Sequence, residues 1–270
     1  MGTFREFEYE GWQAAADHYH AAWSELTSRT IPSIMDALKP AGRFLDLASG
    51  PGYVAAAAPA WAVALDFSPA MVARGAAAYP HLNFLVGDAE RLPFADGSFD
   101  AVGMNLGLLH LGEPETAIAE AFRVLRSGGR FAFTVWSDPT AAQGFQLVLD
   151  AVARHGAPVT VPRGPDFFRY SRTSECLDAL AAVGFVDATT TVVDLRWEPP
   201  DVAAIFPSFL HGTARTGALL RQQEPAAQRA IARDIAERAQ RFVRPDGRVV
   251  IPMPAVLACG VRPPAPPTRP

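Results

Sequence analysis

Beyond Gly42, short apolar runs alternate with alanine-rich runs of helical spacing, and this alternation restricts the fold more than any other feature of the chain. It is typical of βαβ units, in which helices join parallel strands and cover the faces of the sheet. We therefore expect an α/β fold: a seven-stranded sheet with helices on both faces, N-terminal helices and an inserted helical cap. Strands are predicted over residues 43–48, 62–66, 83–86, 100–105, 129–136, 185–195 and 249–260.

Helices are predicted where apolar residues recur at intervals of three and four. Residues 12–38 are expected to form two N-terminal helices, the second opened by Pro32. A helix over 113–125 is expected to end in a cap formed by Ser127, Gly128 and Gly129. Other helices are expected over 53–59, 69–78, 143–155, 173–183 and most of 198–248, with loops over 89–98 and 157–164.

These patterns divide the chain into five parts without an internal repeat. The two ends are a helical N-terminus and a proline-rich tail, and the tail is expected to be disordered. The parts are N-terminal helices (1–41), a ligand-binding core (42–197), a helical cap or lid (198–248), a final core strand (249–260) and the tail (261–270).

Composition excludes several classes of protein. Hydrophobic residues make up 49% of the chain, the 28 acidic and 24 basic residues give a net charge of −4, and no basic cluster stands out, so nucleic acid is not an expected partner. Neither a signal peptide nor a run of membrane-spanning length is visible, which favours a cytoplasmic protein. The protein is expected to be a monomer or a homodimer. Cys176 and Cys259 are far apart and are expected to be buried thiols.

A glycine-rich turn follows the first predicted strand in residues 45–52, Leu-Asp-Leu-Ala-Ser-Gly-Pro-Gly. Gly50 and Gly52 allow a ligand to approach the backbone closely, and the start of the next helix favours an anionic group. Many such turns only connect a strand to a helix. The turn alone therefore leaves ligand binding and simple connection equally open.

Two further acidic positions follow the next two strands. Asp66 ends the second strand at the distance where a ribose-binding acid is expected, and Ser68, directly before Pro69, is the better helix cap. We therefore favour ribose binding over capping for Asp66. After the third strand, Asp88 can accept from an adenine amino group, and the backbone of Ala89 can donate to a ring nitrogen.

Together with residues 99–102 and 124–131, these motifs resemble class I S-adenosylmethionine-dependent methyltransferases, especially the ubiquinone/menaquinone C-methyltransferase-like (type 11) group. The resemblance covers residues 44–136. It implies a Rossmann-like core, S-adenosyl-L-methionine as cofactor, and a tyrosine of the N-terminal helix over that cofactor. The implied binding residues are Asp46, Ala48, Ser49, Gly50 and Gly52 for methionine and ribose, Asp66 for ribose, Phe67, Met71, Gly87, Asp88 and Ala89 for adenine, and Asn105, Leu106, Gly107 and Tyr19 for the remainder.

Two departures from the family pattern bear on function. Ala48 replaces the usual first glycine of the turn, a change that narrows the space without abolishing binding. Residues 105–108, Asn-Leu-Gly-Leu, lack the Asn/Asp-Pro-Pro-Tyr signature of nucleic-acid amino-methyltransferases. The second departure favours a small-molecule acceptor, methylated on oxygen, carbon or nitrogen.

Methyl transfer from a sulfonium needs mainly alignment and at most one general base. His110, after the fourth strand, is the first candidate for that base, and packing beneath the cofactor is the alternative role. His211 in the cap is the second candidate, although it could equally be a surface residue. Tyr19 is favoured over its neighbours His18 and His20 for contact with the cofactor. No metal site is expected, because no cluster has the spacing of metal ligands.

Other functions remain open at this point. A protein of the same fold could bind S-adenosylmethionine and catalyse a non-methylating reaction such as a cyclisation, or bind it without catalysis. A nicotinamide dehydrogenase is disfavoured, because Gly-Asp-Ala follows the third strand and a full Gly-x-Gly-x-x-Gly is missing. Acceptor specificity is expected in residues 198–248 and the N-terminal helices, unless that segment is only a helical hairpin or a dimer surface.

Overall fold

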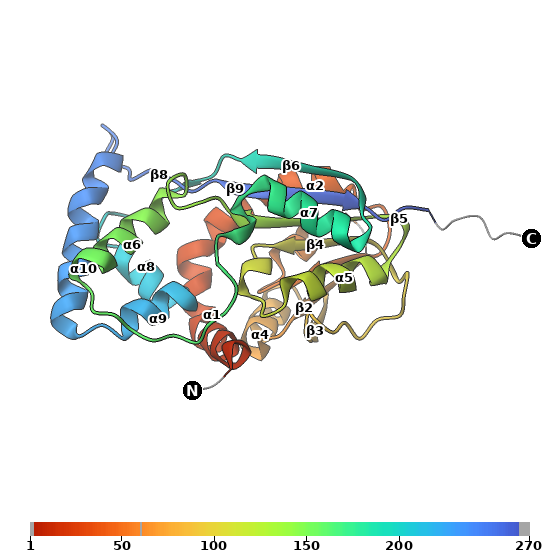
Figure 1. Ribbon diagram of the computed structural model, residues 1–270, viewed down its shortest axis with the longest axis horizontal. Coiled ribbons are helices and arrows are strands. Elements are labelled where there is room, and N and C mark those ends of the chain that lie inside the picture. The colour runs from red at the N-terminus through yellow and green to blue at the C-terminus, as the bar shows by residue number, and fades with distance from the viewer. Residues whose placement is uncertain (1–2, 60, 265–270) are drawn as a thin grey trace, which may run out of the picture.

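The computed structural model describes residues 3–59 and 61–264, and a seven-stranded sheet lies at its centre (Figure 1). The strand order is β3-β2-β1-β4-β5-β9-β6. Strands β1 to β5 are parallel, and β9 runs antiparallel between β5 and β6. The predicted α/β class is confirmed. The strands are β1 (Phe44–Leu47), β2 (Ala62–Asp66), β3 (Asn83–Val86), β4 (Phe99–Asn105), β5 (Leu125–Trp136), β6 (Val186–Val193) and β9 (Ala255–Val261).

Successive residues of the central strands enter two different hydrophobic clusters, as expected for a sheet that is buried on both faces. In β2, Ala62 and Ala64 join one cluster, whereas Val63 and Leu65 join the other. Helices α2 (Ile31–Leu38) and α3 (Tyr53–Ala57) pack on the alanine side, with α4 (Pro69–Ala78) beside β3. Helices α5 (Pro114–Val124) and α7 (Thr173–Val183) cover the other face, in front of the strands in Figure 1.

Helix α1 (Phe4–Ser28) lies between the sheet and the cap helices (Figure 1). It begins at a capping box in which Thr3 and Glu6 exchange hydrogen bonds of 2.7 and 3.2 Å. At its other end the Trp23 ring stacks on Trp197 with 4.8 Å between ring centroids, and its indole N–H donates to the Ser208 carbonyl. The helix therefore begins eight residues before the expected position 12 and joins the core to the cap.

The cap is a layer of helices beside the end of the sheet, at the left of Figure 1. An ion pair of 2.6 Å between Arg154 and Asp234 links α6 to α10. Ile205, Phe209 and Ile231 of the cap are fully buried, so the segment belongs to the main hydrophobic core. The cap helices are α8 (Ile205–Gly212), α9 (Arg215–Arg221) and α10 (Pro225–Ala239), and α6 (Gln143–His155) of the core segment packs against α10.

Two strand predictions need correction. The single strand expected over 249–260 is two elements, because Pro252 and Pro254 lack the N–H that a continuous ladder requires. The first, β8 (Ile251–Pro252), pairs with β7 (Arg196–Trp197) in a separate small sheet, and only β9 joins the main sheet. The other expected strand, 185–195, is shorter and corresponds to β6.

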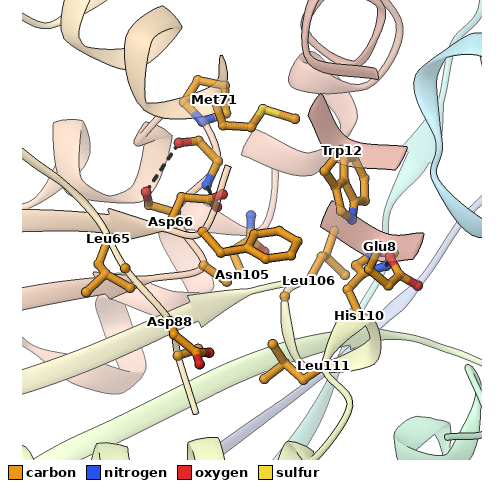
Figure 2. Close-up of a pocket in the computed structure, with 18 of the residues that line it drawn as sticks. Glu8, Trp12, Leu65, Asp66, Met71, Asp88, Asn105, Leu106, His110 and Leu111 are labelled. Carbon is orange, nitrogen blue, oxygen red and sulfur yellow. Dashed lines mark hydrogen bonds and ion pairs between the residues drawn. The ribbon is translucent and has the colours of Figure 1, made fainter. Parts of the chain in front are cut away.

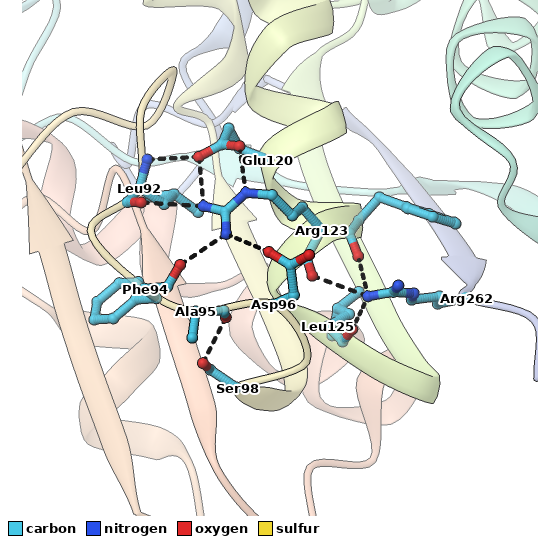
Figure 3. Close-up of polar contacts among 10 residues, drawn as sticks. Leu92, Phe94, Ala95, Asp96, Ser98, Glu120, Arg123, Leu125 and Arg262 are labelled. Atoms are coloured by element: carbon cyan, nitrogen blue, oxygen red, sulfur yellow. Dashed lines mark hydrogen bonds and ion pairs between the residues drawn. The ribbon is translucent and has the colours of Figure 1, made fainter. Parts of the chain in front are cut away.

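The expected glycine cap of the helix before β5 is also wrong. Helix α5 ends at Val124, and Leu125 is already extended with φ −72° and ψ 142°. Arg262 takes the capping role instead, since its Nη1 donates to the carbonyls of Phe122, Arg123 and Leu125 (Figure 3). The expected disordered tail therefore starts too early: Val261 belongs to β9, and residues 265–270 lie outside the described residues.

Arg123 fixes the loop that follows β3 (Figure 3). Its guanidinium donates to the Phe94 carbonyl at 2.7 Å and the Leu92 carbonyl at 3.1 Å, and it pairs with Asp96 and Glu120. Glu120 in turn accepts from the Leu92 N–H at 2.7 Å. A loop without regular structure thus gains fixed partners for its backbone.

We expect Arg123→Met to lower the free energy of unfolding by about 2 kcal/mol, because two backbone carbonyls and two carboxylates lose a donor at once. Urea denaturation measures the effect. Arg233→Met, on the exposed side of α10, is the matched control and should stay within about 0.5 kcal/mol of the wild type. Equal stability of the two variants would show that the network does not hold the loop.

Candidate functional site

A pocket with about 930 Å³ of empty space, partly open to solvent, lies at the carboxyl edge of the sheet. Because β1, β2, β3 and β4 are parallel, the residues that follow each of them meet at this edge. Figure 2 shows Asp66, Asp88, Asn105 and His110 around one space, with Glu8 and Trp12 arriving from α1.

Most of the residues predicted for the site line this pocket. They come from the turn after β1, the ends of β2, β3 and β4, and helix α1. They are Tyr19, Ala48, Ser49, Gly50, Asp66, Phe67, Met71, Gly87, Asp88, Ala89, Asn105, Leu106, Gly107 and His110.

The Asp66 carboxylate is held in the pocket by two backbone N–H groups. Its Oδ2 accepts the Gly50 N–H at 2.7 Å, its Oδ1 accepts the Ser68 N–H at 2.9 Å, and only 6% of the residue is exposed. Burial raises the pKa of Asp66 to about 6, although both hydrogen bonds act in the opposite direction. A carboxylate has about four acceptor positions. Two of them therefore remain for a ligand.

The turn after β1 carries backbone strain at the pocket wall. Ala48 has φ +51° and Leu106, at the end of β4, has φ +56°, a region that side-chain-bearing residues rarely adopt. A Cβ at Gly107 would lie 2.6 Å from the Ala48 Cβ, so the two turns fit only because position 107 is glycine. The Ala48 side chain therefore lies directly against the turn after β4.

Asp46 and Gly52 do not line the pocket, contrary to expectation. Asp46 lies inside β1, fully buried, where Oδ2 accepts the Ala55 N–H at 2.9 Å and Oδ1 has no hydrogen-bond partner in the described part of the chain. Burial raises the pKa of Asp46 well above its ordinary value. Gly52 is the N-cap of α3 with φ +80°, packed beneath the turn. Both residues lie on the side of the turn away from the pocket, because the pocket lining after β1 begins only at Ala48.

Asp88 already has partners on both oxygens. One pairs with Arg5 of α1, and the other accepts the Glu90 N–H at 2.9 Å. By contrast, the Ala89 N–H has no acceptor among the described residues. The Ala89 N–H can therefore donate to a ring nitrogen of an adenine. Asp88 would accept from the adenine amino group while it remains paired with Arg5.

His110 faces the pocket from the 3₁₀ turn after β4. Its Nδ1 lies 3.1 Å from Oε2 of Glu8, and its ring packs edge-on against that of Trp12 with 4.7 Å between the ring centroids. The hydrogen-bond partner of His110 is thus a carboxylate. Tyr19 lies nearby, and burial raises the pKa of its hydroxyl to about 12, so it remains protonated and donates to Thr27.

His211, the second candidate base, does not reach this pocket. It lines an outer hollow between α1 and α8, where its ring lies 5.0 Å from that of His18. Burial lowers the pKa of His211, and the neighbouring His18 and Arg221 act in the same direction. The sequence prediction fails because the face of α8 that carries Phe209 turns toward the core, which leaves His211 on the outer side.

A second, smaller cavity, with about 470 Å³ of empty space that includes open solvent, adjoins the first. Trp12, Tyr19, Leu106 and His110 line both cavities. The walls of the second cavity are mostly aromatic, and cap residues take part in them. The remaining lining residues are Trp23, Thr27, Trp136, Phe145, Phe167, Thr213, Arg215 and Thr216.

The part of α1 before residue 12, and the pocket residues on this face of the helix, are not predicted from the sequence. Arg5, Glu8 and Trp12 line the pocket with Tyr19, at intervals of three, four and seven residues, which is the spacing of one helix face. The spacing is visible in the sequence. The alternation of acidic and aromatic residues before position 12, however, is not typical of a helix with one apolar face. Gln13 adds a further link, since its Oε1 accepts the Ala70 N–H at the start of α4 at 2.9 Å.

Comparison with known proteins agrees with this geometry. Residues 45–133 match a family model described as a methyltransferase domain. A demethylmenaquinone methyltransferase of Renibacterium salmoninarum is 44% identical over 121 residues, which cover 44% of this chain and 49% of that protein. The enzyme of the same name from Streptomyces avermitilis is 36% identical over 147 residues, covering 53% and 63%. The chain thus spans about half the length of the first of these relatives.

Solved structures show the same fold. The [4+2]-cyclase SpnF superimposes with a TM-score of 0.60 at 17% identity over 98% of both chains. A phosphoethanolamine N-methyltransferase of Haemonchus contortus in complex with S-adenosyl-L-methionine gives 0.57 at 15% identity, covering 97% of this chain and 60% of that one. Residues 45–133 are thus similar to a methyltransferase domain and lie on a Rossmann-like sheet, and the resemblance predicted from the motifs is confirmed.

Gly107→Ala is expected to lower the free energy of unfolding by about 1–3 kcal/mol, because the new Cβ would collide with that of Ala48. In an Ala48→Gly background most of this loss should disappear, since the colliding atom is gone. Urea denaturation of the two single variants and the double variant measures the coupling. The same loss in both backgrounds would show that the contact with Ala48 is not what demands glycine.

Proposed function

We propose that this protein is an S-adenosylmethionine-dependent methyltransferase that acts on a small-molecule acceptor. The observation that supports this best is the buried Asp66 carboxylate, held at the end of β2 by the Gly50 and Ser68 N–H groups. Its two remaining acceptor positions suit the neighbouring hydroxyls of a ribose. The match of residues 45–133 to the methyltransferase family supports the same cofactor.

The charges of the pocket favour this cofactor over a dinucleotide. Glu8, Asp66, Asp88 and Glu90 line it against one cation, Arg5, so the wall is mainly acidic. An acidic wall attracts a sulfonium and an ammonium group but repels a pyrophosphate. This distinction supports a methyltransferase over the nicotinamide dehydrogenase considered from the sequence.

Each part of the cofactor has a complementary part of the site. Gly50 presents backbone without a side chain to the methionine end, Asp66 accepts from the ribose, and Ala89 donates to the adenine ring. Phe67 and Met71 supply apolar surface on either side of the adenine. When bound, S-adenosylmethionine supplies an electrophilic methyl group on a positively charged sulfur.

His110 is the proposed general base, because it stands where the two cavities meet. The first cavity would hold the cofactor and the second the acceptor, so a proton leaving the acceptor would have an imidazole within reach. Trp12 and Tyr19 border both cavities and would shield the reacting groups from water. His211 is not proposed for catalysis.

The cap is proposed to be the acceptor-binding part, since Thr213, Arg215 and Thr216 reach the second cavity. The relatives act on demethylmenaquinone by name, and its reduced form is the first acceptor to test here.

The net charge of −4 supports a protein that does not bind nucleic acid. Within residues 3–59 and 61–264, no helix has the length and apolarity to cross a membrane. A cytoplasmic monomer or homodimer completes the proposal.

Methyl transfer itself is the experiment that tests the function. The protein is incubated with S-adenosylmethionine labelled in the methyl group and a panel of small molecules that begins with reduced demethylmenaquinone. Labelled product from at least one acceptor supports the proposal. Binding of the cofactor without any transfer would instead support the alternative of a non-methylating or non-catalytic protein.

Asp66→Asn should weaken S-adenosylmethionine binding about 10- to 100-fold at pH 7, because charge-assisted hydrogen bonds to the ribose are lost. In the wild type, affinity should fall about tenfold from pH 7 to pH 5. The pKa of Asp66 is about 6, so the accepting carboxylate becomes protonated as the pH falls through that value. Calorimetry from pH 5 to 8 measures both effects. A wild type and Asp66→Asn with the same pH dependence would contradict ribose binding by this carboxylate.

His110→Ala should lower kcat about 100-fold or more while the Kd for S-adenosylmethionine changes little. The reason is that His110 would act on the acceptor's proton and not on the cofactor's binding groups. His81→Ala, which lies in the turn before β3 and outside both cavities, is the control. Equal losses of turnover and cofactor affinity in His110→Ala would indicate a packing role instead.

A further inference from the structure

Glu8 is a buried carboxylate in direct contact with the proposed base. Its side chain is 1% exposed, and its Oε2 lies 3.1 Å from Nδ1 of His110. Neither a capping nor a helix-stabilising role explains it, since it points from the middle of the second turn of α1 into the protein. A buried carboxylate requires compensating partners. Those partners come from two other parts of the chain.

Arg215 of α9 provides the second partner through an ion pair, since Oε1 of Glu8 has no hydrogen-bond partner among the described residues. Its Nε lies 3.4 Å from Oε1 of Glu8, and its Nη1 donates to the carbonyl of Leu109, the residue directly before His110. Its Nη2 donates to the Pro165 carbonyl at 2.8 Å. The cap thus contacts both the carboxylate that meets the imidazole and the backbone that carries it.

The ring of His110 is also held against rotation. Trp12 and Phe167 pack edge-on against it, with 4.7 and 5.6 Å between the ring centroids. With Nδ1 directed at Glu8, Nε2 has no hydrogen-bond partner among the described residues, and the side chain lines both cavities. The charged side chains that line the two cavities with His110 are Glu8, Arg215, Asp66, Arg5, Asp88 and Glu90.

We propose that Glu8 is a positioning residue: it accepts the Nδ1–H of His110, keeps Nε2 unprotonated toward the acceptor, and is itself oriented by Arg215. A carboxylate can only accept, so its partner nitrogen must carry the proton in the neutral imidazole. This inference rests on the proposed function. It adds a reason why α1 and the cap must both be in place before the base is competent.

The proton balance explains the use of a charged partner. The acceptor X–H bond breaks and its proton goes to Nε2, while an X–CH₃ bond replaces the S–CH₃ bond, whose electron pair stays on sulfur. The positive charge then resides on the imidazolium, 3.1 Å from the Glu8 carboxylate. Glu8 therefore stabilises the charged form of the base as it develops.

Glu8→Gln distinguishes this role from packing because it preserves shape and removes charge. The amide oxygen is expected to face Arg215, which leaves the amide N–H₂ to donate to Nδ1 of His110. The imidazole proton must then move to Nε2, which can no longer accept from the acceptor. Glu8→Asp keeps a carboxylate and serves as the rescue variant, and Glu10→Gln, exposed on the same helix, is the matched control.

The tautomer is read directly from the imidazole nitrogen resonances of His110 by NMR, with S-adenosylhomocysteine as the bound probe and His110→Ala for assignment. We expect a protonated Nδ1 and an unprotonated Nε2 in the wild type, Glu8→Asp and Glu10→Gln, and the reverse in Glu8→Gln. An Nε2 that is protonated in the wild type, or unchanged in Glu8→Gln, overturns the proposal. The wild-type spectrum alone is decisive if Glu8→Gln does not fold.

Turnover provides a second readout, with reduced demethylmenaquinone or any acceptor that the wild type methylates. Glu8→Gln should lower kcat about 100-fold, leave cofactor affinity within about twofold, and cause no further loss in a His110→Ala background. An additional loss in that background would show that Glu8 acts independently of His110. Failure of the proposed function has a different signature, namely a wild type that does not bind S-adenosylmethionine or that methylates no acceptor.

Discussion

The hydrogen bonds from the Gly50 and Ser68 N–H groups to Asp66 join the two strands on which the site depends. Strands β1 and β2 pair in parallel with Leu47 opposite Leu65, so the turn after β1 meets the end of β2 at one level. A carboxylate buried at that point costs free energy unless it is hydrogen-bonded. The two N–H groups satisfy it, and they also fix the path of the turn around the space where a ribose is proposed to bind.

Helix α1 completes what the sheet edge begins. One of its faces carries Arg5, Glu8, Trp12 and Tyr19 into the first cavity, and its last turns carry Trp23 and Thr27 into the second. The same helix is stacked on the cap through Trp23 and tied to α4 through Gln13. Cofactor binding, acceptor binding and orientation of His110 are therefore proposed to depend on the docking of a single helix.

The fold and the sheet edge could be predicted from the sequence because they rest on local patterns. The strand ends at Asp66, Val86 and Asn105 are where the apolar runs stop, and the pocket residues follow them directly. The failures involve long-range contacts. The capping of α5 by Arg262 joins residues about 140 positions apart, and the Glu8 contact with His110 joins residues 102 apart. Asp46 was assigned to the pocket by motif, although strand alternation places its side chain on the face of the sheet that α3 covers.

Binding of S-adenosylmethionine to the wild-type protein tests the central claim most directly. Calorimetry with S-adenosylmethionine and, separately, with NAD compares the two cofactors that a glycine-rich turn and an acid at the end of β2 could serve. The account predicts saturable one-to-one binding of S-adenosylmethionine and much weaker or undetectable binding of NAD, because the acidic wall opposes a pyrophosphate. Equal or tighter binding of NAD, or no binding of S-adenosylmethionine, would contradict it.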